Sequence, residues 1–286
     1  MSLSARTPAN LDTYKYIPEI FSRNVEEAAK DNLVAWDAIN TQWREDLTMG
    51  DTLYIPKTNT VTATEVTVGT KGTSLDPMAT AAVTLSIDQW YEAPVDIDYM
   101  SSLQSQADVA EYAQTECAYA IKVAIDSSVC ALFDTLGGYS TSGYGSDGQT
   151  LDDDILLYLK ETLDEANVPF ADRSLIIDPS GLADILKIDK LVSQDYVAKK
   201  GAITNGIIGN SVYGCVVRVT NNLTAATTGA YGCMLHKKAL GGAAQIQKSW
   251  KKEFEELHQT RYHSEALWGV VEVRNDFGVP FFTRKK

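Results

Sequence analysis

One uninterrupted helical stretch, Asp108–Leu136, constrains the fold of this chain more than any other feature. It contains neither Gly nor Pro, Asp108 and Glu111 have the spacing of a capping box, and Gly137 and Gly138 follow as a stop signal. At about 1.5 Å per residue this helix would be about 43 Å long, whereas the mean globular helix has about 11–12 residues. We therefore expect a spine that packs against more than one neighbour.

The faces of the predicted helix support this expectation. Apolar residues recur every three or four positions and should carry strands: Ala118, Ile121, Ile125, Val129, Leu132 and Leu136. A second stripe is small and should admit a close backbone, with the returning C-terminal segment as the candidate: Ala113, Cys117, Ala120, Ala124 and Ala131. A third side is polar, and there we predict an i,i+4 ion pair between Lys122 and Asp126.

The chain before the spine has little core of its own. Residues 1–22 are polar and include Pro8 and Pro18, which predicts an extended arm. The stretch Ser22–Trp36 has one apolar side and predicts a helix that suits docking on a neighbour. A frayed terminus is the alternative interpretation of the arm and this helix.

Between the arm and the spine, the pattern changes to a period of two. A period of two is seen in Thr52–Ile55, Val61–Val68 and Val83–Ile87, where Thr and Val dominate, and Gly69–Gly72 would form a tip before the chain returns at Trp90. Large apolar residues are scarce in this excursion, and a two-stranded ribbon is marginal when isolated. We therefore expect another subunit to cover it.

The second half of the chain mixes helices and strands. Gly137–Gly148 is a Gly- and Ser-rich link, and Leu151–Ala166 is a strongly amphipathic helix. Asp178 should cap a short helix that ends at Leu186. The predicted strands are Arg173–Ile177, Val212–Thr220 and Tyr231–Leu235, followed by extended chain over Ala244–Phe282. This order predicts an α+β fold.

Composition excludes several functions. A net charge of -13 argues against binding that tracks nucleic-acid phosphates, which depends on Lys and Arg. The four cysteines form no C-x-x-C pair, so we expect buried free thiols. The N-terminus lacks the apolar core of a signal peptide, and the uncharged runs are broken by Gly, Asn and Thr, so we expect no membrane span.

The residues indicate no catalytic, cofactor or metal site. His236, His258 and His263 lack the i,i+4 spacing of two ligands on one helical face, and no nucleophile-elbow pattern is present. The acidic clusters fit helix N-termini and solvated faces: Asp96 with Asp98, Asp152–Asp154, and Glu253 with Glu255 and Glu256. Lys248, Lys251 and Lys252 precede the last cluster, which favours charge pairing between subunits.

Several short stretches follow one another in a distinctive order and spacing: Ile17–Ser22, Met49–Pro56, Leu85–Trp90, Val95–Asp98, Ala124–Asp126, Arg173–Ser180, Gly209–Gly214 and Lys238–Leu240. In this order and spacing the chain resembles the major capsid proteins of tailed bacteriophages with the Hong Kong 97-type fold. The resemblance extends over Ile17–Phe282.

This resemblance implies a domain organisation. Residues 1–22 would be the N-terminal arm, and residues 50–90 the extended loop that lies over an adjacent subunit. Residues 23–49 and 91–149 would form the peripheral domain, with the spine helix at 108–136. Residues 150–238 would form the axial domain around capsomer axes, and residues 239–286 would return to the peripheral domain.

The resemblance also implies partners. The family builds hexamers and pentamers that close into an icosahedral shell, with a portal at one vertex and double-stranded DNA inside. Only 22 residues precede the first predicted helix, so we expect a separate scaffolding protein. A decoration protein is a further possible partner, and the charge predicts only weak DNA contacts. The implied location is the virion, and the host cytoplasm during assembly.

Some relatives join subunits through an isopeptide bond from a loop lysine. Lys57 and Lys71 are available here, but nothing identifies an asparagine or acid partner, and a solvated lysine is the simpler interpretation. The residues we predict at subunit interfaces are Glu19, Arg23, Lys57, Glu65, Lys71, Asp76, Lys251 and Glu255. An encapsulin-like compartment shell and a soluble α+β enzyme that uses the acidic clusters are the alternative functions.

Overall fold

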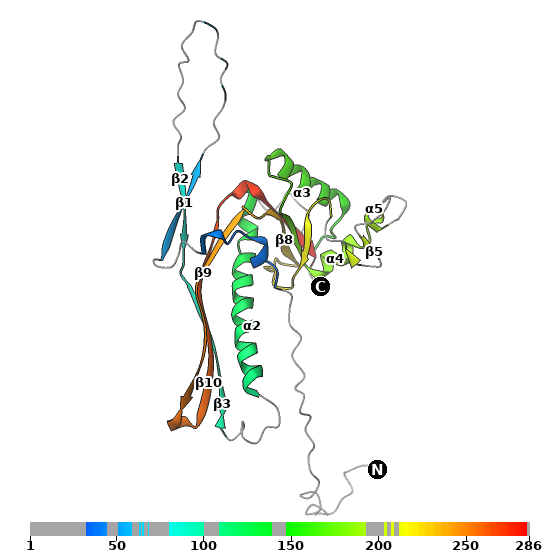
Figure 1. The fold of residues 1–286 in the computed structure, drawn as a ribbon. Coiled ribbons are helices and arrows are strands. Elements are labelled where there is room, and N and C mark those ends of the chain that lie inside the picture. Colours follow the sequence, from blue (N-terminus) through cyan, green and yellow to red (C-terminus); the bar gives the residue numbers. More distant parts are fainter. Residues whose placement is uncertain are drawn as a thin grey trace, which may run out of the picture.

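Two sheets and one long helix organise the computed structural model (Figure 1). It describes residues 33–44, 51–58, 63, 65, 68, 80–99, 109–138, 147–192, 203–204, 207–208 and 212–284. The predicted arm 1–22, almost all of the predicted helix 22–36, the predicted tip Gly69–Gly72 and most of the strand Val61–Val68 lie outside these residues. At the end of the predicted helix, Leu33 and Val34 are not helical, and Trp36–Ala38 is a short 3-10 helix, η4.

The first sheet is a long antiparallel sheet of three strands, in the order β3-β10-β9. Its strands are β3 (Gln89–Asp98), β10 (Gln259–Glu272) and β9 (Leu240–Phe254). The helix α2 (Val109–Cys130) runs along this sheet (Figure 1). Ile121 and Ile125 of α2 pack with Ala266 and Trp268 of β10, which confirms that the apolar stripe carries strands.

The α-helix ends earlier than the sequence predicts. It stops at Cys130, and the chain continues through a turn into the 3-10 helix η6 (Phe133–Gly138). Leu136 already has an extended backbone conformation, with ψ 149°. Phe133 and Leu136 are fully buried against two strands of the second sheet, β8 (Gly229–His236) and β11 (Gly278–Arg284). Their burial explains the change from an α-helix to a 3-10 helix, because tertiary packing overrides the helix propensity of residues 131–136.

The stripe of small residues on α2 is buried over a shorter length of the helix than predicted. Ala113 and Cys117 are buried, and the Cys117 thiol lies 3.9 Å from the backbone oxygen of Tyr262 in β10. The predicted close approach of the returning C-terminal segment is therefore confirmed at this end of the helix. Ala120 and Ala131 are exposed, so the stripe does not continue along the whole spine.

The second sheet is mixed and has four strands, in the order β11-β8-β4-β7. These strands are β11 (Gly278–Arg284), β8 (Gly229–His236), β4 (Arg173–Ile177) and β7 (Val216–Val219). All five residues of β4 are buried, which explains its unbroken apolar pattern in Leu175–Ile177. The predicted strand 212–220 is shorter than expected, because 212–215 form a turn closed by the Val212–Cys215 bridge.

Helices cover this second sheet. The helix α3 (Asp153–Glu165) buries Leu156, Leu159 and Leu163, as its sequence predicts. The helix α4 (Pro179–Ile185) begins at Asp178, whose carboxylate accepts a hydrogen bond from the Ser180 N–H, so the predicted N-cap is confirmed. The short helix α5 (Asp189–Val192) and the two-residue strands β5 (Ile203–Thr204) and β6 (Ile207–Ile208) follow.

A narrow two-stranded arm projects from the end of the long sheet (Figure 1). It consists of β1 (Thr52–Thr58) and β2 (Thr80–Ser86), paired antiparallel from Thr52 with Ser86 to Thr58 with Thr80. Here we call this pair of strands the projecting arm. At the opposite end of the long sheet, β9 and β10 are joined through the 3-10 helix η7 (Glu255–Leu257), and we call residues 251–258 the hairpin tip.

Candidate assembly surfaces

The projecting arm presents nearly all of its surface outward. Tyr54 is 68% exposed, and among the arm residues whose burial the structure describes, Ile55 and Leu85 alone are buried. A two-stranded ribbon gains too little burial to be stable alone in water. The arm can therefore bury its outer surface only against another chain or against residues that the structure does not describe.

Strand β3 forms a second exposed surface. It is an edge strand, paired with β10 on one side, and Trp90 is 70% exposed. Tyr91, Val95 and Tyr99 are also exposed large hydrophobic residues in or next to this strand. An edge strand offers unpaired backbone groups to a second chain. Successive residues of a strand face opposite sides of the sheet, so Trp90 lies on one face and Tyr91 and Val95 lie on the other. Pro94 interrupts the N–H donors in the middle of this edge.

The hairpin tip is charged and exposed. Lys251 and Glu255 are both exposed there, and the Lys251 ammonium lies 3.7 Å from the Glu253 carboxylate. Leu257 is exposed between these charges, and His258 closes the turn with φ 50°. An ion pair in this setting is worth only about 0–1 kcal/mol, so these charges remain available to a second chain.

Below the tip, the strands are fastened across the sheet. The Arg261 guanidinium donates two hydrogen bonds to the Asp96 carboxylate, at 2.6 and 2.7 Å. These hydrogen bonds lower the pKa of Asp96 below its usual value. The Phe254 ring lies under both Lys252 and Arg261, at 5.1 and 5.0 Å from its centroid. This end of the hairpin is therefore held in one arrangement.

The four predicted interface residues that the structure describes lie in two separate places. Lys57 is half-buried on β1 of the arm, and Glu65 is exposed in the stretch between the arm strands. Lys251 and Glu255 share the hairpin tip, at the other end of the long sheet (Figure 1). Glu19, Arg23, Lys71 and Asp76 lie outside the described residues.

Asp126 of the spine has a different role from the predicted one. Its side chain is only 1% exposed, and one carboxylate oxygen accepts hydrogen bonds from the backbone N–H groups of Ala35, at 2.8 Å, and Trp36, at 3.2 Å. Its second oxygen accepts from the Asn222 amide at 3.4 Å. Asp126 therefore faces the interior and joins three segments, rather than facing water beside Lys122. A helical period alone does not separate these two interpretations.

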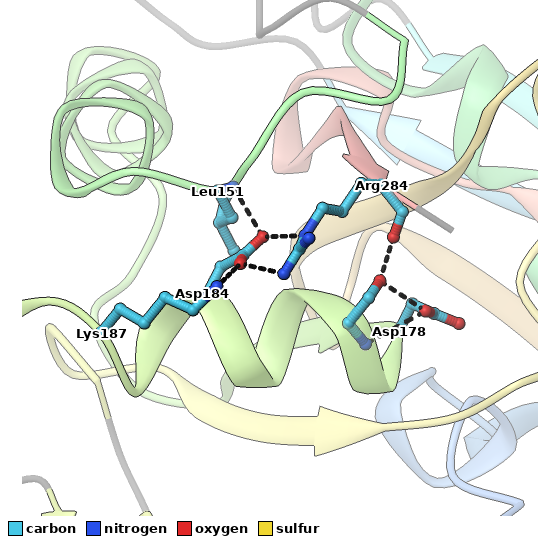
Figure 2. Close-up of polar contacts among 6 residues, drawn as sticks. Leu151, Asp178, Asp184, Lys187 and Arg284 are labelled. Atoms are coloured by element: carbon cyan, nitrogen blue, oxygen red, sulfur yellow. Dashed lines mark hydrogen bonds and ion pairs between the residues drawn. The ribbon is translucent and has the colours of Figure 1, made fainter. Parts of the chain in front are cut away.

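A second buried carboxylate fastens the end of the chain (Figure 2). The Arg284 guanidinium of β11 donates to both oxygens of Asp184 in α4, at 2.8 and 2.6 Å. Lys187 and the Leu151 N–H donate to the same carboxylate. Burial alone would raise the pKa of Asp184, but these hydrogen bonds outweigh it and lower the pKa below the usual value.

A third carboxylate closes the base of the loop between α5 and β7. Asp153 accepts hydrogen bonds from Lys190, which precedes the loop, at 2.6 Å, and from the Tyr213 hydroxyl, which follows it. Desolvation raises the pKa of Tyr213, and the Asp153 carboxylate adds to this effect, so that it reaches about 12. Sequence patterns did not single out Asp184 and indicated other roles for Asp126 and Asp153, because the partners of all three lie at distant positions in the chain.

The histidines and cysteines have structural surroundings. The buried His236 accepts a hydrogen bond from the Lys238 N–H, and His263 stacks on Trp250 while contacting Glu92 at 3.0 Å. All four cysteines are free and buried, as predicted. Within the described residues, no three His, Cys, Asp or Glu side chains are placed to hold a metal ion, and no helix is long and apolar enough to cross a membrane.

Comparison of the whole chain with known proteins identifies its fold. No protein-family model and no curated protein matches the sequence. Solved structures do match. A structure from Mycobacterium phage Che8 has a TM-score of 0.80 at 21% identity, covering 93% of this chain and 97% of that one. The capsid structure of Cyanophage P-SCSP1u has a TM-score of 0.76 at 16% identity, covering 100% and 97%.

A third structure, the asymmetric unit of the bacteriophage PhiM1 mature capsid, has a TM-score of 0.70 at 15% identity and covers 93% of this chain and 91% of that one. The chain has the fold of phage capsid proteins. The predicted α+β capsid fold is therefore confirmed over nearly its whole length, including the projecting arm and the long sheet. Each of these capsid chains is matched over at least nine-tenths of its length, so the likeness is not limited to one shared domain.

Proposed function

We propose that this protein is a structural major capsid protein that assembles as hexamers and pentamers into an icosahedral phage head around double-stranded DNA. The observation that supports this most strongly is the end-to-end match to phage capsid structures. A second observation is the projecting arm, whose exposed ribbon is hard to explain in a protein that works alone. The protein is proposed to act by assembly, without catalysing a reaction.

Within this proposal, the domains follow the boundaries predicted from the sequence, except that β11 joins the sheet of the axial domain. The three-stranded sheet and α2 belong to a peripheral domain, formed by residues 23–49, 91–149 and 239–286. The four-stranded sheet with α3 and α4 belongs to an axial domain of residues 150–238, to which β11 adds the last strand. The projecting arm belongs to an extended loop of residues 50–90 that lies over the adjacent subunit, and residues 1–22 form an N-terminal arm.

The exposed surfaces are proposed to be contacts between subunits. The hairpin tip presents the opposite charges of Lys251 and Glu255. Lys251 of one copy can therefore pair with the glutamate of a neighbouring copy, and the reverse. The projecting arm carries Lys57 and leads to Glu65, which would contact the subunit beneath it. Glu19, Arg23, Lys71 and Asp76 are proposed to take part in the same contacts.

Other partners follow from the same function. A separate scaffolding protein would guide assembly, a portal would occupy one vertex, and a decoration protein could bind the outside. Contact with packaged DNA would be weak and sensitive to salt, because the chain has a net charge of -13. The proposed location is the virion, with assembly in the host cytoplasm.

Electron microscopy of the purified chain tests the proposal. The protein is expressed alone and together with a candidate scaffolding protein, and sedimentation separates subunits from particles. Closed shells or ring-shaped capsomers are the expected result. A chain that remains monomeric under both conditions would contradict the proposal. Closed shells that contain an enzyme and no DNA would instead indicate a compartment shell.

A further inference from the structure

The projecting arm meets the long sheet at a glycine. Gly269 of β10 lies directly beneath the backbone of Ser86, the last residue of β2. A Cβ atom added at Gly269 would overlap the Ser86 carbonyl, at distances that real Cβ atoms do not show, and would lie 3.1 Å from the Ile87 Cα. The obstacle is backbone, so it cannot move aside as a flexible side chain could. The two strands therefore cross at a separation that only glycine permits.

A small apolar core fixes the base of the arm on the same side. Leu85 is fully buried, and Ile55 and Ile87 are nearly so, in a cluster with Ala243 of β9. Leu267 and two valines of β10 and its end, Val271 and Val273, pack around this cluster. The Ile87 N–H donates to the Asp51 oxygen at 2.8 Å and closes the base of the ribbon. The arm thus has a packed seat on the sheet.

The N-terminal segment completes this seat. Asn40 pairs with Gly241 at the edge of β9, through hydrogen bonds of 3.1 Å to the Leu240 oxygen and 3.0 Å from the Gly242 N–H. Trp43 then packs in the cluster beneath the arm, close to the position where Gly241 lacks a side chain. Three segments that are distant in sequence therefore meet at the base of the arm.

We propose that Gly269 is a positioning residue that fixes the angle between the projecting arm and the long sheet within the isolated subunit. The arm is then presented to a second copy of the chain in a preset direction, and ordering it on contact requires little further loss of entropy. The use of this direction in shell assembly depends on the proposed function. The preset angle itself does not.

A distance measurement on full-length subunits tests the preset angle. Spin labels are placed at Ala81→Cys on the arm and Lys122→Cys on α2, two exposed positions. Ala81 lies about 17 Å along β2 from Ser86, because a strand rises about 3.4 Å per residue. The four native cysteines are buried and should not take the label. A second pair, Lys122→Cys and Lys252→Cys, reports on the body of the subunit.

The expected result is a narrow distance distribution in the unassembled wild-type subunit, which Gly269→Ala shifts to a new mean. The body pair should be unchanged. Gly181→Ala is the matched control, because its added Cβ meets only ordinary contacts at 3.5 Å. Leu85→Ala removes packing without a clash and should broaden the arm distribution.

An arm distribution that Gly269→Ala leaves unchanged in a folded subunit would overturn the proposal. If Gly269→Ala does not fold, the width of the arm distribution in the wild-type subunit decides. A broad distribution in the wild type would also overturn the proposal. These measurements use unassembled subunits, so they succeed or fail independently of whether the wild-type chain forms shells.

Discussion

Arg284 and Asp184 are 100 positions apart in the chain and form a two-point ion pair, with distances of 2.8 and 2.6 Å between the guanidinium nitrogens and the carboxylate oxygens (Figure 2). The Asp184 side chain is 3% exposed, and the Arg284 side chain is 33% exposed. The Arg284 backbone oxygen also accepts a hydrogen bond from the Ser180 hydroxyl. The last strand is therefore attached to α4 through both its backbone and its side chain.

Removing this ion pair should loosen the end of the chain. Arg284→Ala leaves Asp184 with Lys187 and the Leu151 N–H, so we expect a loss of about 2 kcal/mol in the free energy of unfolding, the usual value for a hydrogen bond to a charged group. Asp184→Ala leaves the arginine unpaired, and we expect about 3 kcal/mol. Urea unfolding measures both. Lys187→Ala is the control, because this lysine is mostly exposed and should change stability by under about 1 kcal/mol.

The same carboxylate predicts how stability depends on pH. The pKa of Asp184 is lower in the folded chain than its ordinary value of 3.8, so the folded state favours the ionised form. Its contribution is complete above pH 3.8 and is lost as the pH falls through the lower folded pKa. The difference in unfolding free energy between the wild type and Asp184→Asn should be constant from neutral pH to about pH 5 and shrink in stronger acid. A difference that grows on acidification would contradict this role.

The Asp126 carboxylate should anchor the N-terminal segment. Asp126→Ala leaves the Ala35 N–H buried without its acceptor, and an unsatisfied buried donor costs about 1–3 kcal/mol. We expect faster hydrogen exchange at the Ala35 and Trp36 amides, with a loss of about 2 kcal/mol in unfolding free energy. Asp134→Ala removes an exposed acid after the same helix and should change stability by under about 0.5 kcal/mol. Unchanged exchange in Asp126→Ala would show that other contacts hold this segment.

Local patterns in the sequence predicted the elements whose structure is decided locally. Strand Arg173–Ile177 has the predicted bounds, and α3 lies within the predicted 151–166. The Asp178 cap was also predictable, because Asp followed by Pro satisfies the first turn of a helix without distant partners. In each case the residues that determine the element are neighbours in the chain.

Features set by distant contacts were not predictable from one sequence. The spine was expected to continue to Leu136, but burial of Phe133 and Leu136 under the second sheet ends the α-helix at Cys130. Asp126 was placed beside Lys122, because nothing in the helical period reveals that Ala35 and Trp36 approach that face. Gly269 reads as an ordinary strand glycine until Ser86 is placed above it. Such pairings require the three-dimensional arrangement.

Charge reversal at the hairpin tip should change assembly while leaving the fold intact. Lys251 and Glu255 are exposed, and Lys251 has only a 3.7 Å ion pair with Glu253 within the subunit, so Lys251→Glu should change the free energy of unfolding by less than about 1 kcal/mol. If neighbouring copies exchange these charges, Lys251→Glu places like charges together, and each contact weakens by about 1 kcal/mol, which raises the concentration needed for assembly about fivefold. Glu255→Lys should weaken assembly in the same way. The double variant should recover most of the loss, because the opposite charges then meet again with their positions exchanged.

Light scattering as a function of protein concentration measures assembly of the wild type, the two single variants and the double variant. Two single variants that assemble like the wild type would remove these residues from the interface, and a double variant as weak as the singles would show that the two side chains do not face each other.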